Sequence, residues 1–198
     1  IPTAFELVDF DALETLPVEL PDDYAVLYTC PPDGDTDQRL RRFVAALPHE
    51  PARFVYISTT GVYGDCQGAW VDESFPAQPQ VDRAYRRLDA EQQLRAWSAA
   101  GRGDIIILRV AGIYGPGKLP IAHLQQRLPM ISAAEAPWTN RIHIDDLVQI
   151  CRAAMARRMI CSASRSATVT GESSDFTSTA TPRWKYPRVE RPACQAIS

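Results

Sequence analysis

Three hydroxyl side chains stand together where an apolar run of this sequence ends. Ser58, Thr59 and Thr60 follow the run at 53–57, and the glycine-containing stretch 61–64 comes next. A hydroxyl at the carboxyl end of a parallel strand can donate a hydrogen bond to a substrate oxygen. The alternative, which composition alone favours, is a Ser/Thr-rich turn whose hydroxyls satisfy only their own backbone.

Charged side chains that could act beside these hydroxyls follow later in the chain. Arg83 and Arg87 lie one turn apart in a helix-like stretch, so they share a helix face and are suited to clamp a phosphate or a carboxylate. A solvated basic helix face is the alternative. Neither arginine can accept a proton, because guanidinium groups stay protonated in proteins. His143 is a candidate base, since imidazole changes charge near neutral pH, although a packed histidine is the more common case.

These residues need a framework of alternating strands and helices. Apolar runs predict strands at 25–29, 53–58 and 104–109. Amphipathic stretches predict helices after an N-cap at Asp35, at 82–100, at about 119–128 and after Asp146. The alternation predicts an α/β fold with a doubly wound parallel sheet, in which ligands bind beyond the carboxyl ends of the strands.

Composition excludes several classes of function. The 198 residues are 45% hydrophobic and 23% charged, with a net charge of −3, so no basic excess is available for nucleic acid or an anionic membrane. The five cysteines are scattered and the three histidines show no ligand spacing, which predicts no metal site. No apolar run is long enough for a membrane span, and we expect a cytoplasmic protein.

The two ends of the chain differ from its middle. After residue 158 the chain becomes rich in Ser and Thr, with few large apolar side chains, and such a segment cannot offset its ordering entropy. The sequence therefore predicts a globular domain at 1–158 and an irregular or disordered tail at 159–198. The chain also begins at Ile1 rather than Met, which suggests that it is incomplete.

Several motifs in register resemble those of the extended short-chain dehydrogenase/reductases, the family of nucleotide-sugar epimerases and dehydratases. They are Ser-Thr-Thr-Gly-Val-Tyr-Gly at 58–64 with Asp-Glu-Ser-Phe-Pro at 72–76, Leu-Arg-Val-Ala-Gly-Ile-Tyr-Gly-Pro-Gly at 108–117, Arg-Ile-His-Ile-Asp-Asp at 141–146, and the strand and loop at 25–32. The sequences of these motifs are most similar to those of the atypical branch known as NAD-dependent epimerase/dehydratase-like.

The resemblance implies a Rossmann-like sheet that binds NAD or NADP and a small sugar- or nucleotide-sugar-like substrate, with hydride transfer as the reaction. It assigns the catalytic hydroxyl to Thr59, with Thr60 as the fallback. It places the cofactor beside Thr29, Pro31, Ser58 and Arg109. It places the substrate beside Val62, Tyr63, Tyr114, Gly115 and Arg141. The family's glycine fingerprint is missing from the sequence, so the resemblance also implies truncation at the N-terminus.

The sequence departs from the family at its Tyr-x-x-x-Lys pair. Arg83 stands at the tyrosine position and Arg87 at the lysine position, while Tyr85 lies two residues too late to share the site. Three interpretations stay open. The protein is an oxidoreductase or epimerase with another base such as His143, a non-catalytic module that senses a dinucleotide or metabolite, or a non-functional fragment. The choice of NAD or NADP and the oligomeric state, for which a homodimer is one option, are beyond the sequence.

Overall fold

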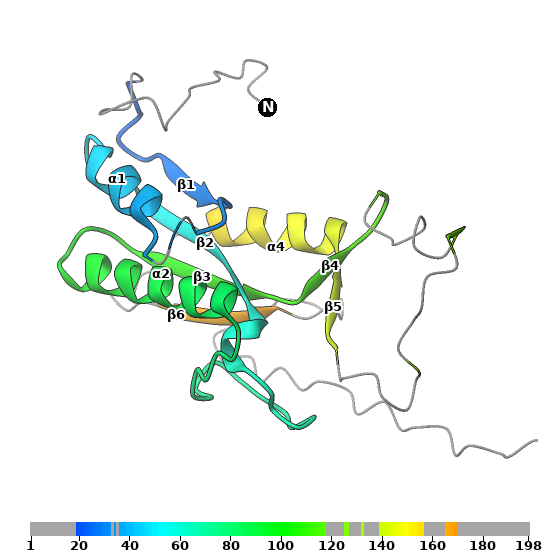
Figure 1. Ribbon diagram of the computed structural model, residues 1–198. Helices are drawn as coiled ribbons and strands as arrows, with labels where there is room; N and C mark the ends of the chain where they lie inside the picture. The colour runs from blue at the N-terminus through cyan, green and yellow to red at the C-terminus, as the bar shows by residue number, and fades with distance from the viewer. Residues whose placement is uncertain are drawn as a thin grey trace, which may run out of the picture.

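A four-stranded parallel sheet forms the centre of the protein. The computed structural model describes residues 19–32, 34, 36–117, 125–126, 132, 139–156 and 165–169. The sheet contains β1 (Ala25–Tyr28), β2 (Arg53–Thr59), β3 (Ile105–Val110) and β6 (Arg165–Val169), side by side in that order (Figure 1). All three pairings are parallel, which confirms the predicted α/β class.

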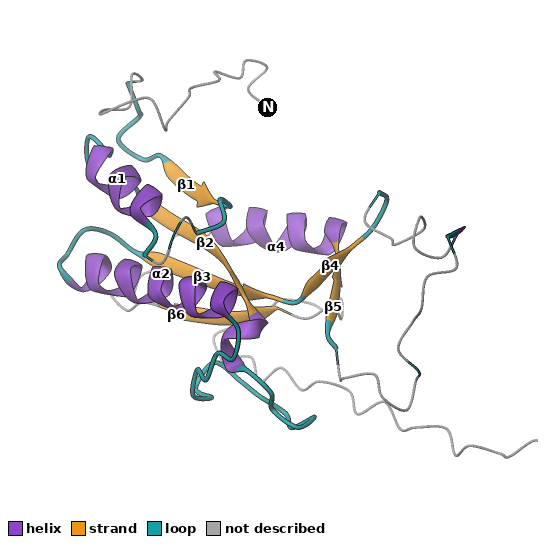
Figure 2. Cartoon of the chain, viewed as in Figure 1, coloured by secondary structure: helices purple, strands orange, loops and turns teal. Residues whose placement is uncertain are grey.

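Helices cover both faces of this sheet (Figure 2). Helices α1 (Gln38–Ala46) and α2 (Asp82–Ala99) lie on one face and α4 (Ile144–Ala156) lies on the other. Alternate residues of a strand point to opposite faces. Phe54 and Tyr56 therefore pack under α1 and α2, whereas Val55 packs with residues of α4. The near-continuous apolar runs of the sequence reflect strands that are buried on both sides.

Two short strands extend the fold beyond the carboxyl end of β3. β4 (Gly112–Tyr114) and β5 (Arg141–His143) pair in parallel as a separate small sheet. A single 3₁₀ turn, η2 (Thr60–Tyr63), continues directly from β2. In the register of the main sheet Ser58 lies opposite Arg109 and Thr59 opposite Val110, so the ends of β2 and β3 are level.

The structure corrects two predictions. The N-cap of α1 is Asp37 rather than Asp35, because the Asp37 carboxylate accepts a hydrogen bond of 3.1 Å from the backbone N–H of Leu40, three residues on. Strand β6 lies inside the segment predicted to be irregular, so that prediction is wrong for residues 165–169. A parallel ladder is made by backbone groups, which composition does not report.

Two other expectations stay untested. The helix predicted at about 119–128 falls outside the described residues except at 125–126. The division of the chain at residue 158 remains a prediction. Among the described helices, none combines the length and apolarity that crossing a membrane requires.

Candidate functional site

A buried ion pair lies behind the end of β2. Glu91 of α2 is 0% exposed and Arg109 of β3 is 5% exposed. The guanidinium donates to both carboxylate oxygens, with Nη2 at 2.7 Å from Oε2 and Nε at 3.1 Å from Oε1. Burial alone disfavours the charged guanidinium, but the hydrogen bonds and negative charge of Glu91 outweigh it and hold the pKa of Arg109 above its ordinary value.

The same carboxylate reaches the hydroxyl cluster. The hydroxyl of Ser58 donates to Oε1 of Glu91 at 2.6 Å. On the other side of the pair, the guanidinium of Arg109 lies over the ring of Tyr63, 4.6 Å from its centroid. The structure thus brings together Ser58, Tyr63 and Arg109, but inside the protein. Val62 is buried as well, at 0% exposed. The side chains of these four predicted cofactor and substrate contacts therefore face protein atoms.

Glu91 is the residue of this network that sequence reasoning missed. Its position on α2 carried a signal, because the buried residues of the helix are Ala84, Ala90, Glu91 and Leu94. An acid on the buried stripe of a helix requires a partner, since an unpaired buried charge is costly. The sequence does not say which strand supplies that partner.

Thr59 and Thr60 lie at the junction of β2 and η2. Both side chains are partly exposed. The hydroxyl oxygen of Thr59 accepts a hydrogen bond of 3.2 Å from the backbone N–H of Gly61. A threonine hydroxyl also carries one donor hydrogen. That hydrogen has no acceptor among the described residues, so the Thr59 hydroxyl is able to donate to a ligand.

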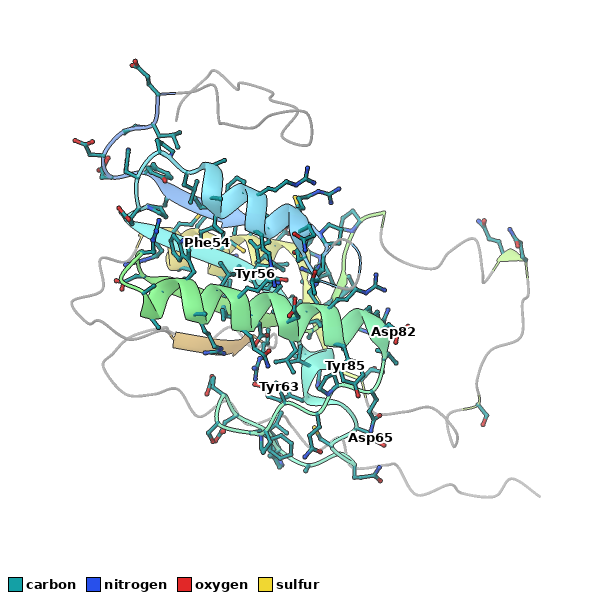
Figure 3. The ribbon with its side chains drawn as sticks, turned by 60° about the vertical axis from the view of Figure 1, so that its left-hand side comes forward. Phe54, Tyr56, Tyr63, Asp65, Asp82 and Tyr85 are labelled. Atoms are coloured by element: carbon teal, nitrogen blue, oxygen red, sulfur yellow. The ribbon has the colours of Figure 1, made fainter. Side chains whose placement is uncertain are left out.

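The two arginines that were expected to act as a clamp differ in their exposure and contacts. Arg87 uses Nη1 to donate to the carbonyl oxygens of Ile57 at 2.9 Å and Cys30 at 3.2 Å, and to the hydroxyl of Tyr56 at 3.2 Å. It therefore ties α2 to the ends of β1 and β2. Arg83 is exposed, near the N-terminal end of α2 that Asp82 and Tyr85 mark in Figure 3.

The phenol of Tyr56 is unsuited to act as a base in place of the missing tyrosine. Its ring is 0% exposed. Burial raises its pKa to about 12, and the nearby Arg87 opposes this shift without reversing it. Tyr85, the other phenol near the motif, is 56% exposed on α2. Neither residue reproduces the family's pair.

A second group of predicted residues meets on the small sheet. Tyr114 and His143 are register partners, and their rings meet edge to face with centroids 5.1 Å apart. Nδ1 of His143 accepts a hydrogen bond of 3.3 Å from the backbone N–H of Asp145 and lies 3.5 Å from its carboxylate. The neutral ring then carries its proton on Nε2. The predicted base and the predicted substrate-side tyrosine are therefore neighbours.

Glycines shape the surroundings of this group. A Cβ at Gly112 would lie 2.7 Å from Nη1 of Arg141, so the exposed Arg141 side chain runs across the bare backbone of β4. Gly115 is buried with φ +151°, and a Cβ there would come within 2.6 Å of Ile144. Gly115 thus permits close packing, while Arg141 presents its side chain to solvent.

The remaining predicted contacts follow β1. Thr29 and Pro31 are exposed directly beyond the end of that strand. In the described part of the chain no cluster of three or more His, Cys, Asp or Glu side chains is arranged to hold a metal ion.

A family model and two curated relatives match this chain. A model of the NAD dependent epimerase/dehydratase family matches residues 38–161. Protein YeeZ of Escherichia coli strain K12 is 40% identical over 109 residues, which make up 52% of this chain and 35% of YeeZ. A dTDP-glucose 4,6-dehydratase of Streptomyces niveus is 36% identical over 77 residues, 38% of this chain and 23% of that protein.

The fold agrees with a solved structure as well. UDP-glucuronic acid 4-epimerase from Bacillus cereus, in complex with UDP-glucuronic acid and NAD, matches with a TM-score of 0.60 and 22% identity, over 68% of this chain and 45% of that one. This likeness shows the Rossmann-like fold. The chain spans only 35% and 23% of the two curated relatives. Because the family model covers residues 38–161 of 198, well over half, the chain belongs to the NAD dependent epimerase/dehydratase family.

Proposed function

We propose that the whole protein is an NAD(P)-dependent oxidoreductase or epimerase that acts by hydride transfer on a sugar- or nucleotide-sugar-like substrate. The observation that carries the proposal is the Thr59 hydroxyl. The resemblance assigns it the position of the family's catalytic hydroxyl; it lies at the end of a parallel strand, its oxygen accepts a hydrogen bond from Gly61, and its donor hydrogen has no acceptor in the part of the chain that the structure describes. A hydroxyl held in this way can stabilise negative charge that develops on a substrate oxygen.

The residues at the end of β1 are suited to contact a nicotinamide dinucleotide, whereas the buried residues Ser58 and Arg109 are not. Thr29 and Pro31 are exposed at the end of β1 and would contact the cofactor, which supplies the hydride acceptor when bound. Ser58 and Arg109 were expected to do the same, but their polar groups are directed to Glu91. We therefore assign them an internal role. The UDP-glucuronic acid 4-epimerase structure holds NAD and a solved structure of RMD from Pseudomonas aeruginosa holds NADPH, which supports a nicotinamide dinucleotide without distinguishing the two.

The proton requires a group other than the usual tyrosine. Arg83 stands at that position and stays charged, so it cannot take a proton from a substrate hydroxyl. His143 is the candidate base, because its ring is partly exposed beside Tyr114. The basic lone pair of the neutral ring is on Nδ1, so taking a proton there requires the ring to release the hydrogen bond from the backbone N–H of Asp145. Arg141, exposed on the same small sheet, is suited to an anionic part of the substrate.

One observation favours a second function. Arg87 replaces the family's lysine, and its Nη1 donates to two backbone carbonyls and to the buried phenol of Tyr56, whose pKa nevertheless stays raised by burial. A non-catalytic module that senses a dinucleotide or metabolite would keep the fold and lose this pair.

Substitutions at the two threonines separate these functions. In the whole protein, tested on a panel of keto and nucleotide-sugar substrates, we expect Thr59→Val to lower turnover by about 10² while Thr59→Ser retains it. An effect confined to Thr60→Val would move the catalytic hydroxyl to Thr60. Turnover that is absent from the wild type, together with micromolar binding of NADH or NADPH by fluorescence titration, would favour the sensing module.

A further inference from the structure

One carboxylate holds both ends of the turn that carries Thr59. Glu91 accepts a hydrogen bond of 2.6 Å from the hydroxyl of Ser58, the residue before Thr59. It also binds Arg109 at 2.7 Å, and the Arg109 guanidinium lies 4.6 Å from the ring centroid of Tyr63, the last residue of η2. The residues between these two anchors include the partly exposed Thr59 and Thr60.

Besides Glu91, a second side chain of α2 also binds β2. One turn earlier on α2, Arg87 donates to the carbonyl oxygen of Ile57 at 2.9 Å. Consecutive turns of the helix thus bind consecutive residues of the strand, Ile57 and Ser58. The end of β2 is held at Ile57 and Ser58, and the turn that follows it is held again at Tyr63. We therefore expect residues 59–62 to have little freedom to move.

Stability alone is a poor explanation for such a pair. Replacing a buried ion pair with apolar residues of similar volume is often neutral or stabilising, because two desolvated charges are costly. Beyond packing, the pair fixes the relative orientation of its two side chains. The planar guanidinium can donate both hydrogen bonds to one carboxylate only within a narrow range of orientations. The pair is therefore better explained by the geometry that it imposes than by the free energy that it adds.

We propose that Glu91 is the positioning residue of the Thr59 turn. It orients the Thr59 hydroxyl by fixing Ser58 directly and Tyr63 through Arg109. The inference rests on the proposed function only in taking Thr59 as the residue that meets the ligand.

The first test measures the turn without requiring activity. Amide hydrogen exchange is followed at Gly61 and Gly64, whose N–H groups bond to Thr59 Oγ1 and to the carbonyl oxygen of Gly61. In Ser58→Ala we expect exchange at these two amides to rise roughly tenfold, while amides in the middle of β3 stay protected. Ser74→Ala removes a hydroxyl-to-carboxylate bond in an exposed loop and is the matched control, with no change expected at Gly61.

A double variant separates positioning from stability. Glu91→Leu combined with Arg109→Met replaces the pair with apolar side chains but leaves the Ser58 hydroxyl without its acceptor, so the urea midpoint should fall by no more than about as much as in Ser58→Ala, while exchange at Gly61 and Gly64 rises as in Ser58→Ala. Unchanged exchange at both amides in Ser58→Ala and in the double variant would overturn the inference. Should the double variant not fold, Ser58→Ala decides alone.

The second test asks whether Glu91 and Ser58 act through Thr59. In the whole protein, Ser58→Ala should lower kcat with little change in KM, and it should have no further effect once Thr59→Val is present. Independent, additive losses would contradict positioning through Thr59. If Thr59→Val leaves turnover unchanged, the proposed function fails, and the exchange experiment still decides whether Glu91 orders the turn.

Discussion

The carboxylate of Glu91 and the guanidinium of Arg109 face each other in a buried ion pair held by two parallel contacts. Their closest atoms are 2.7 Å apart, and the two residues are 0% and 5% exposed. Arg95 approaches the same carboxylate at 3.6 Å, but its side chain is 36% exposed. One acid therefore has a buried partner and a surface partner, which allows the contribution of burial to be measured within a single site.

Removing Arg109, the buried partner of Glu91, should strongly lower the free energy of unfolding. In Arg109→Met the carboxylate of Glu91 stays buried and keeps, among the described residues, only the Ser58 hydroxyl and the more exposed Arg95, so we expect the free energy of unfolding in urea to fall by about 3–5 kcal/mol. Arg95→Met removes the solvent-screened partner and should cost less than about 1 kcal/mol. Equal losses in the two variants would show that the Arg109 pair is not isolated from solvent.

Alkaline pH should destabilise the protein through Tyr56. The folded pKa of about 12 lies above the ordinary value of 10.0, so the folded state keeps a proton that the unfolded state releases. The stabilisation is complete below pH 10 and is lost as the pH rises towards 12, with a total of about 3 kcal/mol. Urea midpoints measured across this range should fall more steeply for the wild type than for Tyr56→Phe. Some slope should persist in that variant, because burial and the nearby Asp37 also raise the pKa of Tyr28.

Two tyrosine hydroxyls should respond oppositely to removal. The hydroxyl of Tyr28 is buried without a hydrogen-bond partner among the described residues, so Tyr28→Phe should raise the free energy of unfolding by about 1 kcal/mol. The hydroxyl of Tyr56 accepts a hydrogen bond from Arg87 at 3.2 Å, so Tyr56→Phe should lower it by about 1–3 kcal/mol at neutral pH. Thermal or urea unfolding of the pair checks both signs, and a loss in Tyr28→Phe would reveal a partner for that hydroxyl.

Gly64 should not tolerate a side chain. It has φ +73°, and a Cβ would lie 2.1 Å from the carbonyl oxygen of Gln78, so Gly64→Ala combines backbone strain with a collision against backbone. We expect a loss of about 4 kcal/mol. Gly101 has a similar φ of +79° with no atom within 4 Å of a Cβ, so Gly101→Ala carries the strain alone, about 1 kcal/mol. Similar losses in the two variants would mean that the loop between Gly64 and Gln78 moves aside.

Much of the fold could be predicted because its signals are local. The strand predicted at 53–58 is β2 (Arg53–Thr59), and the helix predicted at 82–100 is α2 (Asp82–Ala99). Apolar periodicity reports such elements directly, and alternation of strands with helices implies a parallel sheet. Strand β6 was missed because its sequence, Arg-Ser-Ala-Thr-Val, shows little apolar character, and its pairing with β3 depends on the backbone.

The site was harder to predict because its contacts are distant in sequence. Ser58, Tyr63 and Arg109 were identified by motif, but the acid that joins them lies on a helix between them and stood in the sequence as one of many charged residues of α2. The cross-strand contact of Tyr114 with His143 likewise joins segments that only the small sheet brings together. Residue type indicates what a side chain can bind, whereas the fold determines which partner it meets.

The strand order of the main sheet matches the order in which the chain is made. Along the sheet the strands run β1, β2, β3, β6, so each strand joins the outer edge of the one before it. No described strand has to insert between two strands that are already paired. As the polypeptide leaves the ribosome, N-terminal segments are free to fold first, and each later strand meets a finished partner. For the described strands, this order is compatible with stepwise assembly during translation, in which β6 joins after β1, β2 and β3.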